Sequence, residues 1–240
     1  PFTKVLREYM IVAIDGPAGA GKSSVARKLA ERVNFQHLDS GALYRCFTYI
    51  ALESNKDVSS PDGWEQLISD HEVEANYKVF PAKFFIDSKD VSELIRENRV
   101  SNAVALVSTH ATVRDAVVET LRSISTTGNF IVDGRDIGSV VFPKAELKFF
   151  LTASIHERAK RRHIELKTKG SNVTLEELEN EIRCRDKSDS TRSLSPLIQA
   201  KDAELVDSTR MDINEVIELI KLKIESRLCQ QEGSLETISG

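Results

Sequence analysis

The sequence predicts an α/β protein in which a parallel central sheet is flanked by helices. Two observations support this prediction. Short, largely apolar runs at residues 10–14, 129–133 and 147–151 are rich in β-branched and aromatic residues and too short for helices, as expected of buried strands. Helical spacings of apolar residues separate these runs, and an alternation of strand and helix is typical of parallel sheets.

The pattern is clearest at the start of the chain. The first strand, at residues 10–14, ends at Asp15, and apolar residues then recur at helical spacing between residues 25 and 33. A second strand is expected at 35–39 and a second helix at 43–52. The chain therefore opens with a strand–turn–helix–strand unit.

The middle of the chain follows a different pattern. From about residue 70 to 91, apolar and polar residues alternate, with an interruption at Pro81. This alternation predicts a small antiparallel ribbon with one solvated face, inserted between helical stretches that resume at 92–125. The remaining expected elements are a charged stretch at 154–187, a Ser/Asp/Thr-rich loop to 196, a strand at 205–207 and an amphipathic helix at 213–224.

Composition narrows the class of protein. The 240 residues are 40% hydrophobic and carry 33 basic against 37 acidic side chains, so the chain can bury a sizeable core without metals or disulfides. The net charge of −4 argues against a general nucleic-acid binder, and the 3 cysteines form neither a zinc motif nor a disulfide framework. No apolar run of about 20 residues and no signal-peptide pattern is present, which argues against a membrane span and against secretion. We expect reduced cysteines, a cytoplasmic location and, since nothing demands an oligomer, a monomer that binds neither membrane nor nucleic acid.

A phosphate-binding loop follows the first strand. Residues 16–23 read Gly-Pro-Ala-Gly-Ala-Gly-Lys-Ser, which matches G-x-x-x-x-G-K-[ST] between a strand and a helix. Glycines let backbone N–H groups surround phosphate oxygens, the lysine can reach the β- and γ-phosphates of ATP, and the serine hydroxyl can ligate Mg²⁺. We therefore expect ATP at Gly16, Pro17, Ala18, Gly19, Ala20, Gly21, Lys22, Ser23 and Ser24, with Ser23 as the metal ligand.

Further motifs lie downstream in a fixed order. They are His37-Leu-Asp-Ser-Gly-Ala-Leu-Tyr-Arg45, Asp133-Gly-Arg-Asp-Ile-Gly-Ser-Val-Val-Phe-Pro143, Arg185-Asp-x-x-Asp-x-x-Arg192 and Asp202-Ala-Glu-Leu-Val-Asp-Ser-Thr209. Together with the loop, and from about Met10 to Arg227, they closely resemble the bacterial cytidylate kinases. The resemblance implies one P-loop kinase domain with a small antiparallel β insert and a helical lid. It also implies Mg²⁺-dependent transfer of the γ-phosphoryl group of ATP to CMP or dCMP.

The resemblance further implies a role for each matching residue. The acceptor phosphate would be held by Arg45, Arg135 and Arg192, the cytosine edge by Ser40, Arg114 and Asp136, and the sugar hydroxyls by Arg185 and Asp189. Arginine suits this chemistry because its planar guanidinium grips phosphate with two hydrogen bonds and stays charged. Asp133 would act near the acceptor phosphate or a metal-bound water. Tyr44 would support the acceptor pocket or, alternatively, serve as a packed aromatic residue.

A basic cluster at residues 157–163 is interpreted as part of the lid. Arg158 and Arg162 are four residues apart, so they are expected to share a helical face that closes over the transferring phosphate. The alternative is a solvated helix face or an incidental patch that attracts RNA. The expected catalytic set is Lys22, Asp133, Arg135, Arg158 and Arg162.

Ala105 departs from the family pattern, in which this position commonly holds a serine that helps to read the base. Alanine has no hydroxyl, so we expect a water or Ser108 to replace it, or the discrimination between bases to be looser. The expected organisation is a core at about 8–55, 110–157 and 194–230, a monophosphate-binding region with its insert at 56–109, a lid at 158–193 and a disordered tail at 231–240.

Other classes of P-loop protein are alternatives to this kinase. The nearest alternative is a P-loop kinase with another acceptor, such as UMP, AMP or a non-nucleotide. A guanine-nucleotide switch normally carries Asn-Lys-x-Asp, and residues 55–58 (Asn-Lys-Asp-Val) miss that spacing. A motor or transporter ATPase normally has an acidic pair after its second strand motif, whereas Gly134 follows Asp133.

Overall fold

The computed structural model describes residues 9–168, 170 and 172–236, and within them a parallel sheet has the order β2-β6-β1-β7-β8. Its strands are β1 Ile11–Asp15, β2 Gln36–Asp39, β6 Phe130–Gly134, β7 Leu147–Thr152 and β8 Glu204–Asp207. The predicted fold class, a parallel sheet flanked by helices, is therefore confirmed.

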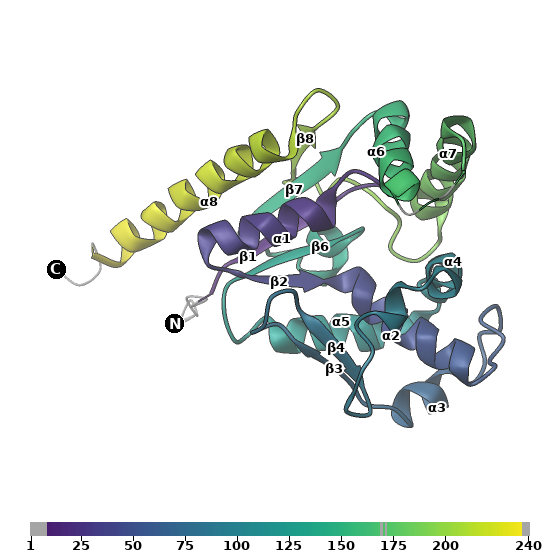
Figure 1. The fold of residues 1–240 in the computed structure, drawn as a ribbon. Helices are drawn as coiled ribbons and strands as arrows, with labels where there is room; N and C mark the ends of the chain where they lie inside the picture. The colour runs from purple at the N-terminus through teal and green to yellow at the C-terminus, as the bar shows by residue number, and fades with distance from the viewer. Residues whose placement is uncertain (1–8, 169, 171, 237–240) are drawn as a thin grey trace.

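Helices cover both faces of this sheet (Figure 1). They are α1 Lys22–Val33, α2 Ser40–Glu53, α5 Ala111–Ile124 and α8 Ile213–Glu236. Val12 and Ile14 of β1 pack with α1 and α8 in one core, whereas Ile11 and Ala13 pack with α2 and α5 in the other. Successive side chains of a strand point to opposite faces, so one apolar strand supplies both cores.

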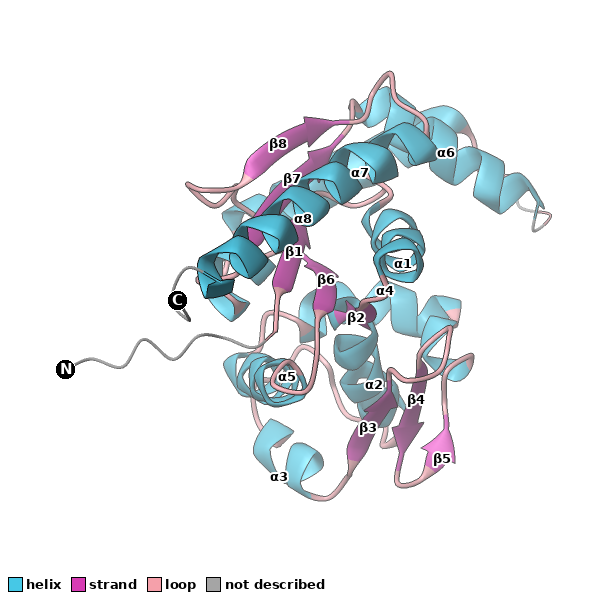
Figure 2. Cartoon of the chain, turned by 90° about the vertical axis from the view of Figure 1, so that its left-hand side faces the viewer, coloured by secondary structure: helices cyan, strands magenta, loops and turns pink. Residues whose placement is uncertain are grey.

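The predicted ribbon is a small antiparallel sheet set apart from the central one (Figure 2). Its strands are β3 Val73–Asn76, β4 Lys83–Ile86 and β5 Lys89–Asp90, flanked by α3 Trp64–Ser69, the 3-10 turn Leu94–Arg96 and α4 Asn98–Val107. Phe84 and Ile86 of β4 are buried whereas Lys83 is exposed, so the alternation in the sequence marks a one-sided sheet. Trp64 is 1% exposed and packs as an anchor of this region.

Two helices form the region predicted as the lid, α6 Ile155–Thr168 and α7 Leu175–Thr191. They pack on each other through a small cluster in which Ala159, Leu178 and Ile182 are buried. A loop was expected to begin at residue 188. This prediction is wrong for residues 188–191, because α7 ends only at Thr191. The hydroxyls of Ser190 and Thr191 donate to carbonyls four residues earlier, each at 2.7 Å, so these residues stay inside the helix.

Helix α8 extends past the predicted end at residue 224 and reaches Glu236. The first part of the expected tail, up to residue 236, therefore belongs to this helix, while 237–240 lie outside the described residues, as do 1–8 at the other end. Over the described ranges, no helix is both long enough and apolar enough to cross a membrane.

Candidate active site

The phosphate loop joins the end of β1 to the start of α1. Gly16 has no room for a side chain, because an added Cβ would lie 2.0 Å from the carbonyl oxygen of Leu151. Gly21, which directly precedes α1, has a φ of 88°, in the left-handed region that favours glycine. The loop can therefore bring backbone N–H groups and the positive end of α1 close to phosphate oxygens.

Lys22 is buried inside this loop. Its side-chain ammonium donates to the carbonyl of Pro17 at 2.8 Å, and the residue is 6% exposed. Burial, and next the nearby Arg135 cation, lower the pKa of Lys22, while the charge of Asp133 opposes them. A phosphate bound in the loop would favour the charged lysine.

Asp133, at the end of β6, connects three elements of the site. Its Oδ2 accepts the Ser23 hydroxyl at 2.6 Å, its Oδ1 lies 2.6 Å from Nε2 of His37, and its carbonyl accepts the Ser40 hydroxyl at 2.7 Å. Burial raises the pKa of Asp133, but the hydrogen bonds from His37 and Ser23 and the charges of His37 and Lys22 lower it overall. The structure thus brings Ser23, Ser40 and Asp133 together, and adds His37, for which the sequence analysis assigned no role.

Asp15 is a second buried carboxylate that was not predicted. Its oxygens accept the N–H groups of Ile137 at 2.8 Å and Gly138 at 2.7 Å, at the start of a π-helical turn, Ile137–Val141. Burial raises the pKa of Asp15 to about 6, despite these two bonds. Asp15 therefore ties the end of β1 to the turn that follows Asp136; its signal in the sequence is an aspartate directly before the loop.

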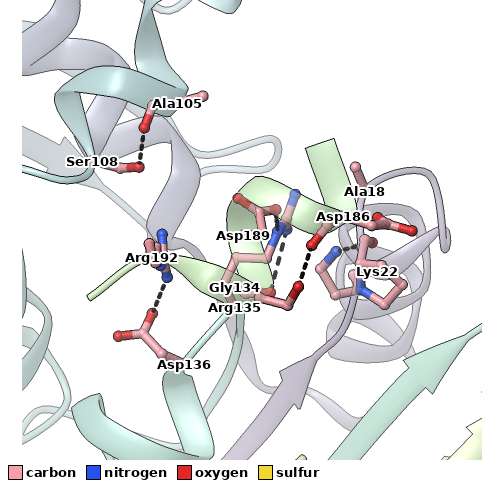
Figure 3. A network of polar contacts seen from close by, with 12 residues as sticks. Ala18, Lys22, Ala105, Ser108, Gly134, Arg135, Asp136, Asp186, Asp189 and Arg192 are labelled. Carbon is pink, nitrogen blue, oxygen red and sulfur yellow. Dashed lines mark hydrogen bonds and ion pairs between the residues drawn. The ribbon is translucent and has the colours of Figure 1, made fainter. Parts of the chain in front are cut away.

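Two of the three residues predicted to meet the base, Arg114 and Asp136, contact each other, while the third, Ser40, bonds the carbonyl of Asp133. Arg114 donates to the carboxylate of Asp136, and both side chains are 6% exposed. The Arg114 guanidinium is 5.8 Å from the centre of the Tyr44 ring, and burial raises the pKa of Tyr44 to about 12. A second arginine, Arg192, has its Nη2 3.9 Å from Oδ1 of Asp136 (Figure 3). This cluster offers fixed donors and acceptors beside an aromatic ring.

Two arginines hold buried nitrogens without a hydrogen-bond partner in the described part of the chain, Nε of Arg185 and Nη2 of Arg192. Burial lowers the pKa of both guanidinium groups. Arg135, by contrast, donates through Nε to Asp189 at 2.8 Å (Figure 3). Unpaired buried donors are costly, and a bound anion would satisfy them.

Helix α4 borders this side of the site. Arg45 of α2 donates to the Ser101 hydroxyl of α4 at 2.8 Å. Ala105, one turn further along, is exposed, and its carbonyl accepts the Ser108 hydroxyl at 2.8 Å (Figure 3). The proton of Ser108 is therefore already engaged, so in this arrangement Ser108 can offer a nucleotide base only the lone pairs of its single hydroxyl oxygen and no free donor.

The structure places Arg158 and Arg162 in different surroundings. Arg158 is 4% exposed; it pairs with Asp186 through distances of 3.0 and 2.6 Å and donates to the carbonyl of Ala18 at 3.0 Å. Arg162 is exposed and pairs with Glu165 at 2.9 Å. Side chains four residues apart point in directions that differ by about 40° around the helix axis. At the edge of the contact between α6 and α7, this difference is enough to bury Arg158 and expose Arg162.

A cavity of about 760 Å³ lies beside the loop, between α1, α6 and the segment 208–213. Gly21, Val25 and Met211 contribute to its lining, together with Arg161, which donates to the carbonyl of Ser208 at 2.8 Å. The size suits a nucleoside. Arg161 was predicted only as a member of the basic lid cluster, and no role was predicted for Met211. Their approach to this cavity depends on the folded position of the segment after β8.

The oxygen donors at the loop suit a magnesium–nucleotide complex. Among the described residues, no group of three or more His, Cys, Asp or Glu side chains could hold a metal ion. Mg²⁺ carried by a nucleotide needs few protein ligands, since phosphate oxygens and water fill most of its coordination shell. The Ser23 hydroxyl donates a hydrogen bond to Asp133, and its oxygen lone pairs stay available for such an ion.

Known proteins of similar sequence identify the family of this chain. The model of the cytidylate kinase family matches residues 12–226. The cytidylate kinase of Carboxydothermus hydrogenoformans is 48% identical over 212 residues, which cover 87% of this chain and 94% of that protein. Those of Enterococcus faecalis (44% identical, 90% and 96% covered) and Alkaliphilus oremlandii (42% identical, 89% and 96% covered) are similar over the same extent. This chain belongs to the cytidylate kinase family.

Proposed function

We propose that this chain transfers the γ-phosphoryl group of ATP to CMP or dCMP, giving CDP or dCDP, in a reaction that requires Mg²⁺. The observation that supports this most is the buried Arg114–Asp136 pair beside Tyr44. Asp136 lies just after β6, and the phosphate loop follows the neighbouring strand β1. A loop for a donor phosphate and a rigid polar pocket for a second ligand therefore share one edge of the sheet.

On the donor side, the phosphate loop and Lys22 would hold the β- and γ-phosphates, and the cavity near Arg161 would hold the nucleoside. The hydroxyl of Ser23 would be the protein ligand of Mg²⁺. When bound with the nucleotide, the ion would neutralise negative charge that develops during transfer.

On the acceptor side, three arginines would bind the monophosphate: Arg45, Arg135 and Arg192. Ser40, Arg114 and Asp136 would contact the cytosine edge, and Arg185 and Asp189 the sugar hydroxyls. The buried nitrogens of Arg185 and Arg192 that lack a hydrogen-bond partner in the described part of the chain favour this assignment, because an incoming nucleotide could accept from them. Arg135 would exchange its present partner, Asp189, for the phosphate, since guanidinium binds phosphate with two strong hydrogen bonds.

Phosphoryl transfer requires the protein mainly to position the two substrates and to stabilise negative charge. The acceptor phosphate is already an adequate nucleophile, so no strong general base is required. Lys22, Arg135 and Arg162 would stabilise the negative charge that spreads over the transferred group, and Arg158 would do so or would hold Arg162 and the lid in place. Asp133 would orient Ser23 and a water near the acceptor phosphate.

The remaining assignments follow from this function. We propose that the protein works in the cytoplasm as a monomer in pyrimidine nucleotide metabolism, with small nucleotides and no nucleic acid as its partners. A related kinase with UMP as acceptor is the second candidate, because Ala105 cannot donate a hydrogen bond to a base.

An ADP-release assay with CMP, dCMP, UMP, AMP and GMP in turn tests the proposal. We expect CMP and dCMP to be turned over far faster than AMP or GMP, and Arg135→Ala to lose most of this activity. The proposal would fail if CMP gave no ADP, or if all five acceptors reacted at equal rates.

A further inference from the structure

We propose that His37 is a positioning residue for the metal-binding hydroxyl of Ser23, and that it acts through Asp133. The inference rests on the proposed kinase function and extends it to a residue that has no part in the roles assigned above. His37 lies on β2, two residues before Asp39, and its ring reaches across to the end of β6.

The carboxylate of Asp133 is held at both oxygens by donors from different elements. Nε2 of His37 lies 2.6 Å from Oδ1, and the hydroxyl of Ser23 donates to Oδ2 at 2.6 Å. A carboxylate bonded at both ends cannot rotate without breaking a bond. The ring of His37 therefore fixes the plane of the group that receives the Ser23 proton.

Burial makes this fixation matter. Asp133 is 3% exposed and the His37 side chain 12% exposed, so water competes little for the bond between them. No other donor to Oδ1 of Asp133 is found in the described ranges, and a buried oxygen left without a donor is costly. Asp39 lies opposite Asp133 in the register of β2 and β6, so a second carboxylate would push Asp133 out of place once the ring is removed.

The consequence falls first on Ser23 and leaves in place the residues that would contact the base. Ser23 has one hydroxyl proton; while Asp133 Oδ2 accepts it, the lone pairs of the oxygen face away from Asp133 and are free for a cation. If Asp133 rotates, the Ser23 hydroxyl loses this orientation. Arg114 and Asp136 bond each other and do not contact His37, so binding of the acceptor base should not change.

The test compares His37→Ala with His37→Gln, whose amide can still donate from a position close to Nε2. The readout is the affinity for Mn²⁺, measured by electron paramagnetic resonance on the full chain with a non-hydrolysable ATP analogue. We expect His37→Ala to weaken Mn²⁺ binding about fivefold to tenfold, as for the loss of one buried hydrogen bond, and His37→Gln to recover most of the affinity. The KM for CMP should stay within about twofold in both variants.

A matched control is His110→Gln, since His110 is also partly buried and bonds a carbonyl, that of Val58 at 2.7 Å, away from the loop. It should leave Mn²⁺ affinity unchanged. If His37→Ala fails to fold by circular dichroism, His37→Asn replaces it, because the shorter amide does not reach Asp133.

Two results would overturn the inference: Mn²⁺ affinity that is unchanged in His37→Ala, or affinity that is weakened equally in His37→Gln. A double variant adds a second check. Ser23→Ala combined with His37→Ala should lose no more than Ser23→Ala alone, because the two residues act in series, and additive losses would contradict that arrangement. Failure of the wild type to phosphorylate CMP would instead count against the proposed function, since the Mn²⁺ measurement needs no turnover.

Discussion

Ser23 and Asp133 are 110 residues apart in the chain, yet the hydroxyl of Ser23 donates a 2.6 Å hydrogen bond to Oδ2 of Asp133. This bond joins the first turn of α1 to the end of β6, the strand beside β1. The carboxyl ends of neighbouring parallel strands meet at one edge of a sheet, and ligands bind there in folds of this kind. The bond therefore places the loop for the donor phosphate next to the motif that carries the acceptor-side residues.

Replacing Lys22 with alanine should lower kcat by about a hundredfold or more, the loss typical when a group that stabilises developing charge is removed. The fold should remain, because the ammonium bonds one backbone carbonyl and its burial is unfavourable to the charge. ADP release and thermal melting check both parts. A melting temperature lower by more than about 10 °C would mean that Lys22 is structural, since that shift exceeds the effect of about 2 kcal/mol in a domain of this size.

The two lid arginines should behave differently. Arg158→Ala breaks a pair with Asp186 and removes a bond to Ala18, so it should lower the free energy of unfolding by about 2 kcal/mol as well as activity. Arg162→Ala removes an exposed side chain and should change the unfolding free energy by less than about 0.5 kcal/mol. Its kcat should fall, because we propose that the lid brings Arg162 to the transferred phosphoryl group.

Urea denaturation and initial rates measure these effects. Equal losses of stability in both variants would contradict the different surroundings of the two side chains. An Arg162→Ala variant with full activity would remove Arg162 from the set of residues that stabilise the transferred group.

Introducing a hydroxyl at residue 105 tests how the base is read. Ala105 is exposed, and its carbonyl accepts a hydrogen bond from the hydroxyl of the nearby Ser108. Ala105→Ser should therefore raise the ratio of kcat/KM for CMP over UMP by about fivefold, the effect of one added hydrogen bond. Ser108→Ala should change that ratio by less than about twofold, because the Ser108 hydroxyl is held by the carbonyl of Ala105 on its own helix. An unchanged ratio in Ala105→Ser would show that this position does not contact the base.

Asp15 should make stability depend on pH in a direction opposite to that of a salt-bridged carboxylate. Its pKa is about 6 in the folded chain against 3.8 as the ordinary value, so the folded state binds the proton more tightly. The contribution of Asp15 to stability is therefore greatest below pH 3.8 and falls as the pH rises through 6.

Comparison with Asp15→Asn isolates this contribution. The quantity to compare is the free energy of unfolding of the wild type minus that of Asp15→Asn. This difference should be about 2 kcal/mol smaller at about pH 7.5 than at about pH 4.5. Urea titrations at both pH values measure the difference. A difference that does not change with pH would contradict a raised pKa for Asp15.

Much of the fold could be predicted because its signals are local. The apolar run at 10–14 is buried on both faces, and the alternation in β4 is read correctly as a one-sided sheet. The end of α7 could not be predicted from composition, since Ser190 and Thr191 favour loops unless their hydroxyls bond the preceding turn.

The residues of the site that belong to a sequence motif could be predicted. The contacts that depend on the order of strands in the sheet could not. The phosphate loop follows from its motif, and the family resemblance assigns Arg114 and Asp136 to the same edge of the base, where they form an ion pair. The bonds of Asp15 to the π-helical turn and of His37 to Asp133 depend on β1 and β2 both pairing with β6, which spacing in the sequence does not reveal. Burial of Arg158 depends likewise on how α7 packs on α6.

A competition experiment tests the central claim most directly. CMP, dCMP, UMP, AMP and GMP are mixed at equal concentrations with limiting ATP, Mg²⁺ and the wild-type protein, and the diphosphates formed are separated by chromatography. The ratio of products then reports the ratio of kcat/KM values in one tube. We predict that CDP and dCDP form first and account for nearly all the product. A mixture dominated by UDP, ADP or GDP, or the absence of any diphosphate other than the ADP left from ATP, would contradict the assignment.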